Sequence, residues 1–115
     1  MQRDDMVYVC HILDAAHKAL LFTQNHTRKE MDTNEMLSLS LVRLLEIIGE
    51  AANVVSTDFR EKHSHIPWKK MIGLRNRLIH GYFDINLDII WDTVVEDLPP
   101  LVLDLEKIIL LEEAT

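Results

Sequence analysis

The sequence is poor in the residues that form tight turns and disulfides. Its 115 residues include three glycines, three prolines and one cysteine. So few turn-forming residues argue against a sheet-rich fold, and an apolar content of 48% favours helices joined by short loops. The single cysteine, Cys10, excludes an internal disulfide and fits a reducing compartment.

Long apolar runs are also missing. The longest spans about four residues, at 108–111, far short of the roughly 20 needed to cross a bilayer. The charged start at residues 3–5 leads into an amphipathic pattern, so we expect no signal peptide and no membrane association. The length suits one domain over residues 1–115 with a core that needs no structural metal. We therefore expect a cytoplasmic protein.

The net charge of −7 argues against generic, phosphate-driven binding of nucleic acid. The charge is unevenly distributed, however. Residues 60–80 hold six basic residues and one acidic residue, a local charge of +5, whereas the rest of the chain carries −12. This basic island is either a solvated surface or the place where the protein contacts an anion. Its candidate RNA-binding residues are Lys69, Lys70 and Arg77.

Apolar residues recur at spacings of three and four, as in amphipathic helices. The first such stretch covers about residues 4–25, with Met6, Val9, Leu13, Ala16 and Leu20 in phase. The second follows an N-terminal cap signal at residues 32–35 and runs to about residue 55. A third runs from Pro67, well placed as a first helical residue, to the natural stop at Gly81.

The last stretch begins after Asn86 and contains two prolines. Its apolar stripe keeps its phase across Pro99-Pro100, which predicts one helix kinked there or two nearly coaxial helices. A short helical turn is expected at residues 58–62. These patterns predict an all-α fold, an antiparallel bundle of four to five helices.

The third stretch carries a charged residue on its apolar stripe. At about 100° per residue, Trp68, Ile72 and Ile79 lie within about 40° of one another, with Met71 about 60° to one side. Arg75 lies in the middle of that stripe. An unpaired buried charge costs several kcal/mol. Arg75 therefore either pairs with a carboxylate, such as Glu46 or Glu50, or faces an interface or a cleft.

His80 and Arg75 suit the cleavage of RNA. Histidine can accept the proton of the ribose 2′-hydroxyl or protonate the leaving 5′-oxygen, an effect of about 10²–10⁴-fold. Arginine can hold the phosphate with two hydrogen bonds and stabilise its developing charge. On a straight helix, however, the two residues lie about 140° apart. Either the helix unwinds near Gly81, or two copies pack motif to motif and line one groove.

Metal and cofactor sites are not expected. His63 and His65 have neither the i, i+4 spacing nor the nearby cysteines of a zinc site. The other histidines of the first stretch are expected at the surface. The sequence has no phosphate-binding glycine loop and no nucleophilic serine elbow.

The segment Arg75-Asn76-Arg77-Leu78-Ile79-His80-Gly81-Tyr82 resembles a known signature: arginine, four residues, histidine, any residue, tyrosine. This is the signature of the HEPN superfamily, specifically of its HepT-like toxins. Residues 43–52 resemble the second-helix segment of that family, and residues 66–68 and 91–99 resemble its flanks. The likeness covers about residues 34–105 and is specific as a set.

The resemblance implies a helical bundle that forms a homodimer through the motif-bearing helices, with a composite ribonuclease site. It implies that Arg75 and His80 are catalytic, that Asn76 is a polar supporting residue, and that no metal takes part. It also implies a partner antitoxin, a minimal nucleotidyltransferase called MntA, that silences the toxin by adenylylating Tyr82.

These observations leave three hypotheses for the function of the protein. The first is the metal-independent endoribonuclease toxin of a toxin–antitoxin pair. The second is a non-catalytic HEPN binding module that partners a nucleotidyltransferase, in which His80 is dispensable. The third is a structural bundle in which Arg75 bridges to Glu46 or Glu50.

Overall fold

The computed structural model describes residues 2–81 and 84–114, and these residues contain helices but no strand. The prediction of an all-α fold is confirmed. In chain order the elements are α1 (Gln2–Thr23), the 3₁₀ helix η1 (Arg28–Asp32), α2 (Glu35–Val54), α3 (Thr57–Lys62), α4 (Trp68–His80), α5 (Leu87–Asp92), the π-helix η2 (Thr93–Asp97) and α6 (Leu98–Glu113).

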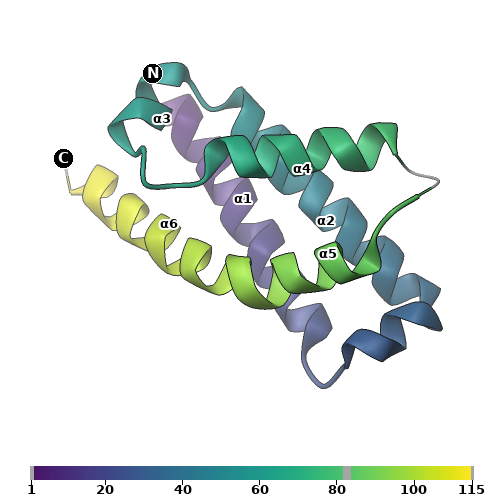
Figure 1. The fold of residues 1–115 in the computed structure, drawn as a ribbon. Helices are drawn as coiled ribbons and strands as arrows, with labels where there is room; N and C mark the ends of the chain where they lie inside the picture. The colour runs from purple at the N-terminus through teal and green to yellow at the C-terminus, as the bar shows by residue number, and fades with distance from the viewer. Residues whose placement is uncertain (1, 82–83, 115) are drawn as a thin grey trace.

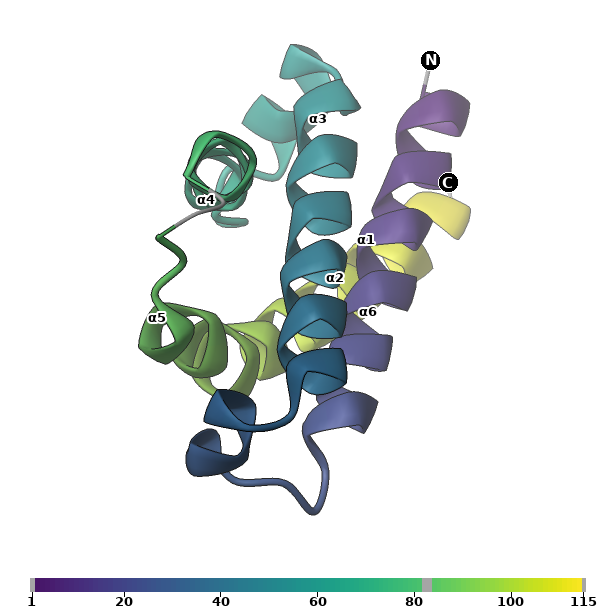
Figure 2. The ribbon, with the colours of Figure 1, turned by 90° about the vertical axis from the view of Figure 1, so that its right-hand side faces the viewer.

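The helices form a bundle around the α1–α2 pair. Figures 1 and 2 show α1 and α2 side by side and antiparallel, joined through η1. Helix α4 packs along α2, while α6 crosses α1 (Figure 1). The rod formed by α5, η2 and α6 runs antiparallel to α4. The motif-bearing helix therefore rests on one helix, α2, and has the rod on its other side.

The apolar stripe predicted for α2 is the buried one. Its leucines, isoleucine and alanine at 37, 41, 44, 48 and 51 are all buried. The predicted stripe of α1 is confirmed in part: Val9 and Ala16 are fully buried, whereas Met6, Leu13 and Leu20 are only partly buried. The buried face also includes Ile12, Ala15 and Ala19. Helix α1 contacts both α2 and α6, which widens the face that is buried.

Asparagine side chains cap the starts of α2 and α5, two helices that lie near α4. The Asn34 side chain accepts a hydrogen bond from the backbone N–H of Leu37 at the start of α2. The Asn86 side chain accepts from the N–H groups of Asp88 and Ile89 at the start of α5. These bonds satisfy donors that the first helical turn leaves without partners. They place both helix starts where the sequence predicted them.

The predicted break in the last helix occurs as a π-helix immediately before the prolines. The N–H of Leu98 donates to the carbonyl of Thr93, five residues back. Pro99 and Pro100 then lie in the first turn of α6, where their missing N–H groups would otherwise have bonded to the preceding turn. The extra residue of the π turn accommodates the prolines without separating α5 from α6, which remain one rod (Figure 1).

None of the helices within residues 2–81 and 84–114 combines the length and apolarity that crossing a membrane requires.

Candidate active site on helix α4

Helix α4 lies on α2 through a narrow apolar face. Trp68, Met71 and Leu78 are buried, and the indole Nε1 of Trp68 donates to the carbonyl of His63 at 3.0 Å. Ile72 and Ile79, which the sequence placed on the central stripe, are only partly buried. The buried face is therefore rotated toward Met71 and Leu78.

Arg75 lies on this face, at the crossing of α2 and α4. A Cβ added at Gly49 of α2 would overlap the Cβ of Arg75 and would lie 2.7 Å from the carbonyl oxygen of Met71. The lack of a side chain at Gly49 thus permits the close approach of the two helices. Glycine in a helix interior costs about 1 kcal/mol relative to alanine, and the helix contact compensates for that cost here.

The guanidinium of Arg75 has no carboxylate partner among the described residues. Its Nη1 donates to Oδ1 of Asn76 at 3.0 Å, while its Nε is buried and has no hydrogen-bond partner. Glu46 and Glu50 instead pair with Nη1 of Arg43, each at 3.5 Å. The alternative in which Arg75 bridges to Glu46 or Glu50 is therefore wrong, because Arg43, on α2 with the two glutamates, pairs with both carboxylates. The other alternative, that Arg75 faces an interface or a cleft, stays a prediction.

His80 lies on a different side of α4. It is the last residue of the helix, and it is exposed. The helix leaves its regular geometry only at Gly81, whose N–H donates to the carbonyl of Arg77 at 2.8 Å. Unwinding before His80, one of the two expected ways of bringing it to Arg75, does not occur. Within one chain, Arg75 and His80 remain on separate faces.

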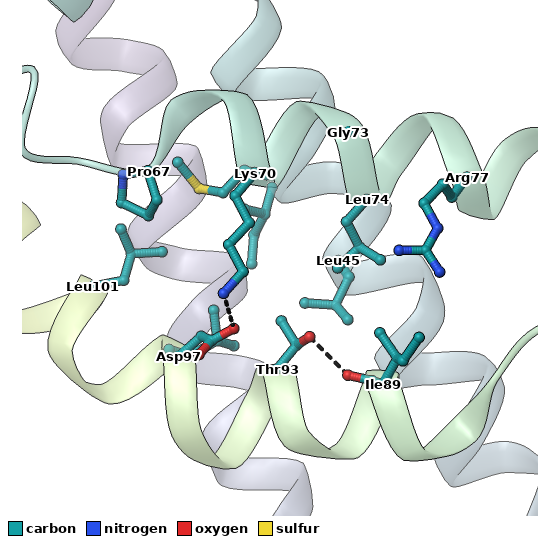
Figure 3. A pocket seen from close by; sticks show the side chains of 13 residues that line it. Leu45, Pro67, Lys70, Gly73, Leu74, Arg77, Ile89, Thr93, Asp97 and Leu101 are labelled. Carbon is teal, nitrogen blue, oxygen red and sulfur yellow. Dashed lines mark hydrogen bonds and ion pairs between the residues drawn. The ribbon is translucent and has the colours of Figure 1, made fainter.

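Arg77 lines two of the cavities that adjoin α4. The first, of about 270 Å³, lies between α4 and the rod and includes Leu45 of α2 at its wall (Figure 3). The second, of about 400 Å³, includes His80 and Asp84. Arg75 lines neither of these two cavities. Arg77 is exposed and forms no ion pair among the described residues, so its charge is available to a ligand.

The other two predicted RNA-binding residues, Lys69 and Lys70, differ in whether an ion pair already neutralises their charge. Lys69 is exposed and makes no ion pair within residues 2–81 and 84–114. Lys70 pairs with Asp97 of η2 at 2.9 Å, across the first cavity (Figure 3). Tyr82 lies outside the described residues.

The histidines outside α4 have structural contacts. His63 is buried and lies 2.8 Å from Oε2 of Glu112 at the end of α6. Its ring also packs against Phe59. His11 and His17 are exposed as predicted, whereas His26 is partly buried beside Glu30. In the described part of the chain, no three histidine, cysteine or acidic residues are grouped as metal ligands.

Sequence reasoning missed two features of this region. Gly49 was part of the segment that carried the family resemblance, but no role was assigned to it; an isolated glycine in an apolar helical pattern was the available signal. The cavity between α4 and the rod, with Thr93 and Asp97 on its wall, had no sequence signal. Its lining comes from α2, α4 and the α5–η2–α6 rod, which only the tertiary structure brings together.

Comparison with known proteins finds relatives over most of the chain. The chain is 41% identical to "Putative RNase MJ1380" of Methanocaldococcus jannaschii, over 91% of this chain and 96% of that protein. It is 37% identical to "Putative RNase TTE0752" of Caldanaerobacter subterraneus subsp. tengcongensis, over 89% and 91% of the two chains. It is 34% identical to "Probable ribonuclease HepT" of Thermococcus cleftensis, over 94% and 98%. No solved structure matches the chain.

An all-helical domain whose α4 carries an arginine and a histidine five residues apart has the features of the HEPN superfamily. More specifically, residues 12–108 match the family described as Ribonuclease HepT-like, and the chain belongs to that family. The resemblance drawn from residues 34–105 is thereby confirmed and extended into α1.

Proposed function

We propose that this protein is a ribonuclease of the HepT type, a metal-independent endoribonuclease whose active site is completed by a second copy of the chain. The observation that carries the proposal is the state of Arg75. Its buried Nε has no hydrogen-bond partner among the described residues, and neither Glu46 nor Glu50 pairs with its guanidinium there. A buried donor left without a partner costs about 1–3 kcal/mol, a cost that suits a residue kept for function rather than for stability. Membership of the family and the names of the relatives support the same reaction class.

The proposed reaction is a transfer within the RNA strand. His80 removes the proton of a ribose 2′-hydroxyl, whose oxygen then attacks the adjacent phosphorus. The bond from phosphorus to the 5′-oxygen breaks, and that oxygen takes a proton from an imidazolium. The products are a 2′,3′-cyclic phosphate and a 5′-hydroxyl. Arg75 stabilises the added charge on the phosphate, and Asn76, which accepts from Arg75 Nη1, orients its guanidinium.

A homodimer explains how the two catalytic residues meet. Arg75 and His80 occupy separate faces of a regular helix, so one chain does not direct both at one phosphate. If the α4 helices of two copies pack together, Arg75 of one chain can lie near His80 of the other. A two-fold axis through this contact would create two equivalent sites or one shared groove.

The net charge of −7 limits how much of the surface can bind RNA. Lys69 and Arg77 remain as candidates for phosphate contacts, because both are exposed and neither has an ion-pair partner in the described chain. Lys70 contributes less, because Asp97 neutralises it. We therefore propose a narrow RNA footprint on α4.

The direct test is cleavage of RNA by the purified protein in excess chelator. We expect cleavage that leaves cyclic phosphate ends, and its loss in Arg75→Ala and His80→Ala proteins. Cleavage that requires added metal would overturn the metal-independent mechanism. If the wild-type protein does not cleave but binds a nucleotidyltransferase, the binding-module alternative is correct.

We further propose that the activity serves a cytoplasmic toxin, which a cognate MntA-like nucleotidyltransferase silences by adenylylating Tyr82. Expression alone should arrest growth, and His80→Ala should abolish the arrest. Co-expression with the nucleotidyltransferase should add the mass of one or more adenylates to the wild-type protein. The same added mass in Tyr82→Phe would show that another residue is modified.

A further inference from the structure

The cavity between α4 and the α5–η2–α6 rod, here named the apolar cavity, is built like a ligand site. Its walls are mostly leucine, isoleucine, methionine and proline side chains, with a few polar groups among them. Ligand sites in proteins combine an apolar lining with a few placed polar groups. At about 270 Å³ the cavity is slightly smaller than drug-sized pockets, so it admits one ring system rather than a folded strand.

The apolar cavity adjoins the cavity that contains His80. Leu74, Arg77 and Ile89 line both of them and form the wall that the two share. Arg77 therefore has the apolar cavity beside it and the cavity of the proposed catalytic histidine next to that. Asp84 also lines the second cavity, but its negative charge repels a phosphate, so Arg77 is the residue there that suits one. The arrangement places sites for an apolar group and a phosphate next to His80.

We infer that the apolar cavity binds a nucleobase of the RNA substrate, while Arg77 holds the phosphate of the same nucleotide and directs the strand toward His80. The inference rests on the proposed ribonuclease function and gives that function a specificity site. Proteins that recognise single-stranded RNA place splayed bases in pockets of aromatic or apolar side chains and hydrogen-bond their edges. Arginine suits a phosphate because its planar fork can donate two hydrogen bonds.

Polar groups on the wall of the apolar cavity can read the edge of the base. The Thr93 hydroxyl donates to the carbonyl of Ile89 at 2.7 Å, so its oxygen can still accept a hydrogen bond from a base N–H. The Lys70–Asp97 pair supplies a donor and an acceptor from opposite sides of the cavity (Figure 3). Thr93 and Asp97 both belong to η2, and π turns are frequent at functional sites.

Gly73 provides a way to obstruct the cavity without disturbing the core. It lies at the exposed edge of the cavity, and a Cβ added there would meet nothing within 4 Å. Gly73→Leu should therefore narrow the entrance that a base would use, while α4 gains helix propensity. Gly73→Ala leaves most of the volume and is the matched control. Cys10→Leu, at an exposed position on α1, controls for an added leucine elsewhere.

The binding experiment uses methyl NMR of the full-length protein with each of the four nucleoside 3′-monophosphates and with inorganic phosphate. We expect at least one nucleotide to shift the methyl signals of Leu74, Ile89 and Leu101, with affinity about tenfold weaker in Gly73→Leu, because the base loses part of its apolar contact. Gly73→Ala and Cys10→Leu should bind as the wild type does. Phosphate alone should leave Leu101 unshifted. If no nucleotide shifts these methyls, or if Gly73→Leu binds unchanged, the inference is wrong.

The cleavage experiment separates this inference from the proposed function. On RNA of random sequence, the wild type should prefer particular bases beside the cut, and Gly73→Leu should lose that preference and raise KM with a smaller effect on kcat. Loss of preference with cleavage retained supports the base site. An unchanged preference in Gly73→Leu, with cleavage still abolished by Arg75→Ala, would overturn the base site and leave the ribonuclease proposal standing.

Discussion

Gly49 of α2 faces Arg75 of α4 so closely that a methyl group at position 49 would overlap the arginine Cβ. The contact fixes how near the motif-bearing helix approaches the core. It also buries the Nε of Arg75, which has no hydrogen-bond partner among residues 2–81 and 84–114. The position of the proposed catalytic arginine therefore depends on a residue that carries no side chain.

Gly49→Ala should destabilise the fold by about 1–3 kcal/mol, because the new methyl meets Arg75 and the carbonyl oxygen of Met71 at 2.7 Å. Urea denaturation measures the change. Gly73→Ala is the matched control on α4, where the methyl meets nothing within 4 Å, and it should be neutral or stabilising by up to about 1 kcal/mol. Equal effects of the two substitutions would contradict the close packing of α2 and α4 at Gly49.

Arg75→Met should separate the chemical role of Arg75 from its packing role. Methionine keeps the apolar stem that lies against Gly49 and removes the buried, unpartnered Nε. The free energy of unfolding should change by less than about 1 kcal/mol, while RNA cleavage falls by about 10²–10³-fold. Denaturation and cleavage assays on the same preparation check both. Strong destabilisation with little loss of cleavage would instead indicate a structural arginine.

Mixed dimers should test whether the site is shared between two copies. When Arg75→Met and His80→Ala chains are co-expressed, half of the dimers should be mixed, and one of the two sites in each should be intact. Activity should return to at most about a quarter of the wild-type value, although each variant alone is inactive. A mixture as inactive as its components would point to a site within one chain.

The folded protein should lose stability in acid, because a carboxylate near the end of α6, that of Glu112, is paired with two basic side chains. Lys62 Nζ at 2.9 Å, and then His63 Nε2 at 2.8 Å, lower the pKa of Glu112. A lowered pKa in the folded protein stabilises it at pH values above about 4.3, the unfolded value, and this contribution disappears as the pH falls through the folded pKa. Glu112→Gln should therefore be less stable than the wild type at pH 7, with a smaller difference at pH 3.

Glu113→Gln provides the control for this pH dependence. Glu113 is exposed and is the next residue in the chain. Its substitution should leave the difference in unfolding free energy between pH 7 and pH 3 unchanged. If Glu112→Gln and the wild type lose the same stability on acidification, the Lys62–Glu112–His63 cluster does not contribute as described.

The helices and their limits could be predicted from the sequence because their signals are local. The stripe of α2 at residues 37–51 is periodic, Asn34 and Asn86 cap helices through neighbouring N–H groups, and Gly81 ends α4. Each signal depends on residues within about one turn. The break near Pro99 was also predicted, although the π turn that accommodates it was not.

The partner of Arg75 could not be predicted, because helical angles describe one helix and not its contacts. Glu46 and Glu50 were within plausible reach of Arg75, but Arg43 on their own helix reaches both. Similarly, periodicity placed apolar residues on α1 without showing that its alanines would face two neighbouring helices. Such choices depend on how closely helices pack, and side chains from several helices decide that distance.

The sequence by itself determined the all-α class, the helix limits and the motif from Arg75 to Tyr82 that relates the chain to its family. Tertiary structure decided that Arg75 has no carboxylate partner within the described residues, that His80 faces another side of α4, and that Arg77 lines two cavities. The physical reason is the separation along the chain over which each interaction acts. Capping and periodicity act within a turn or two, whereas these relationships arise where α2, α4 and the α5–η2–α6 rod, distant in the chain, come together.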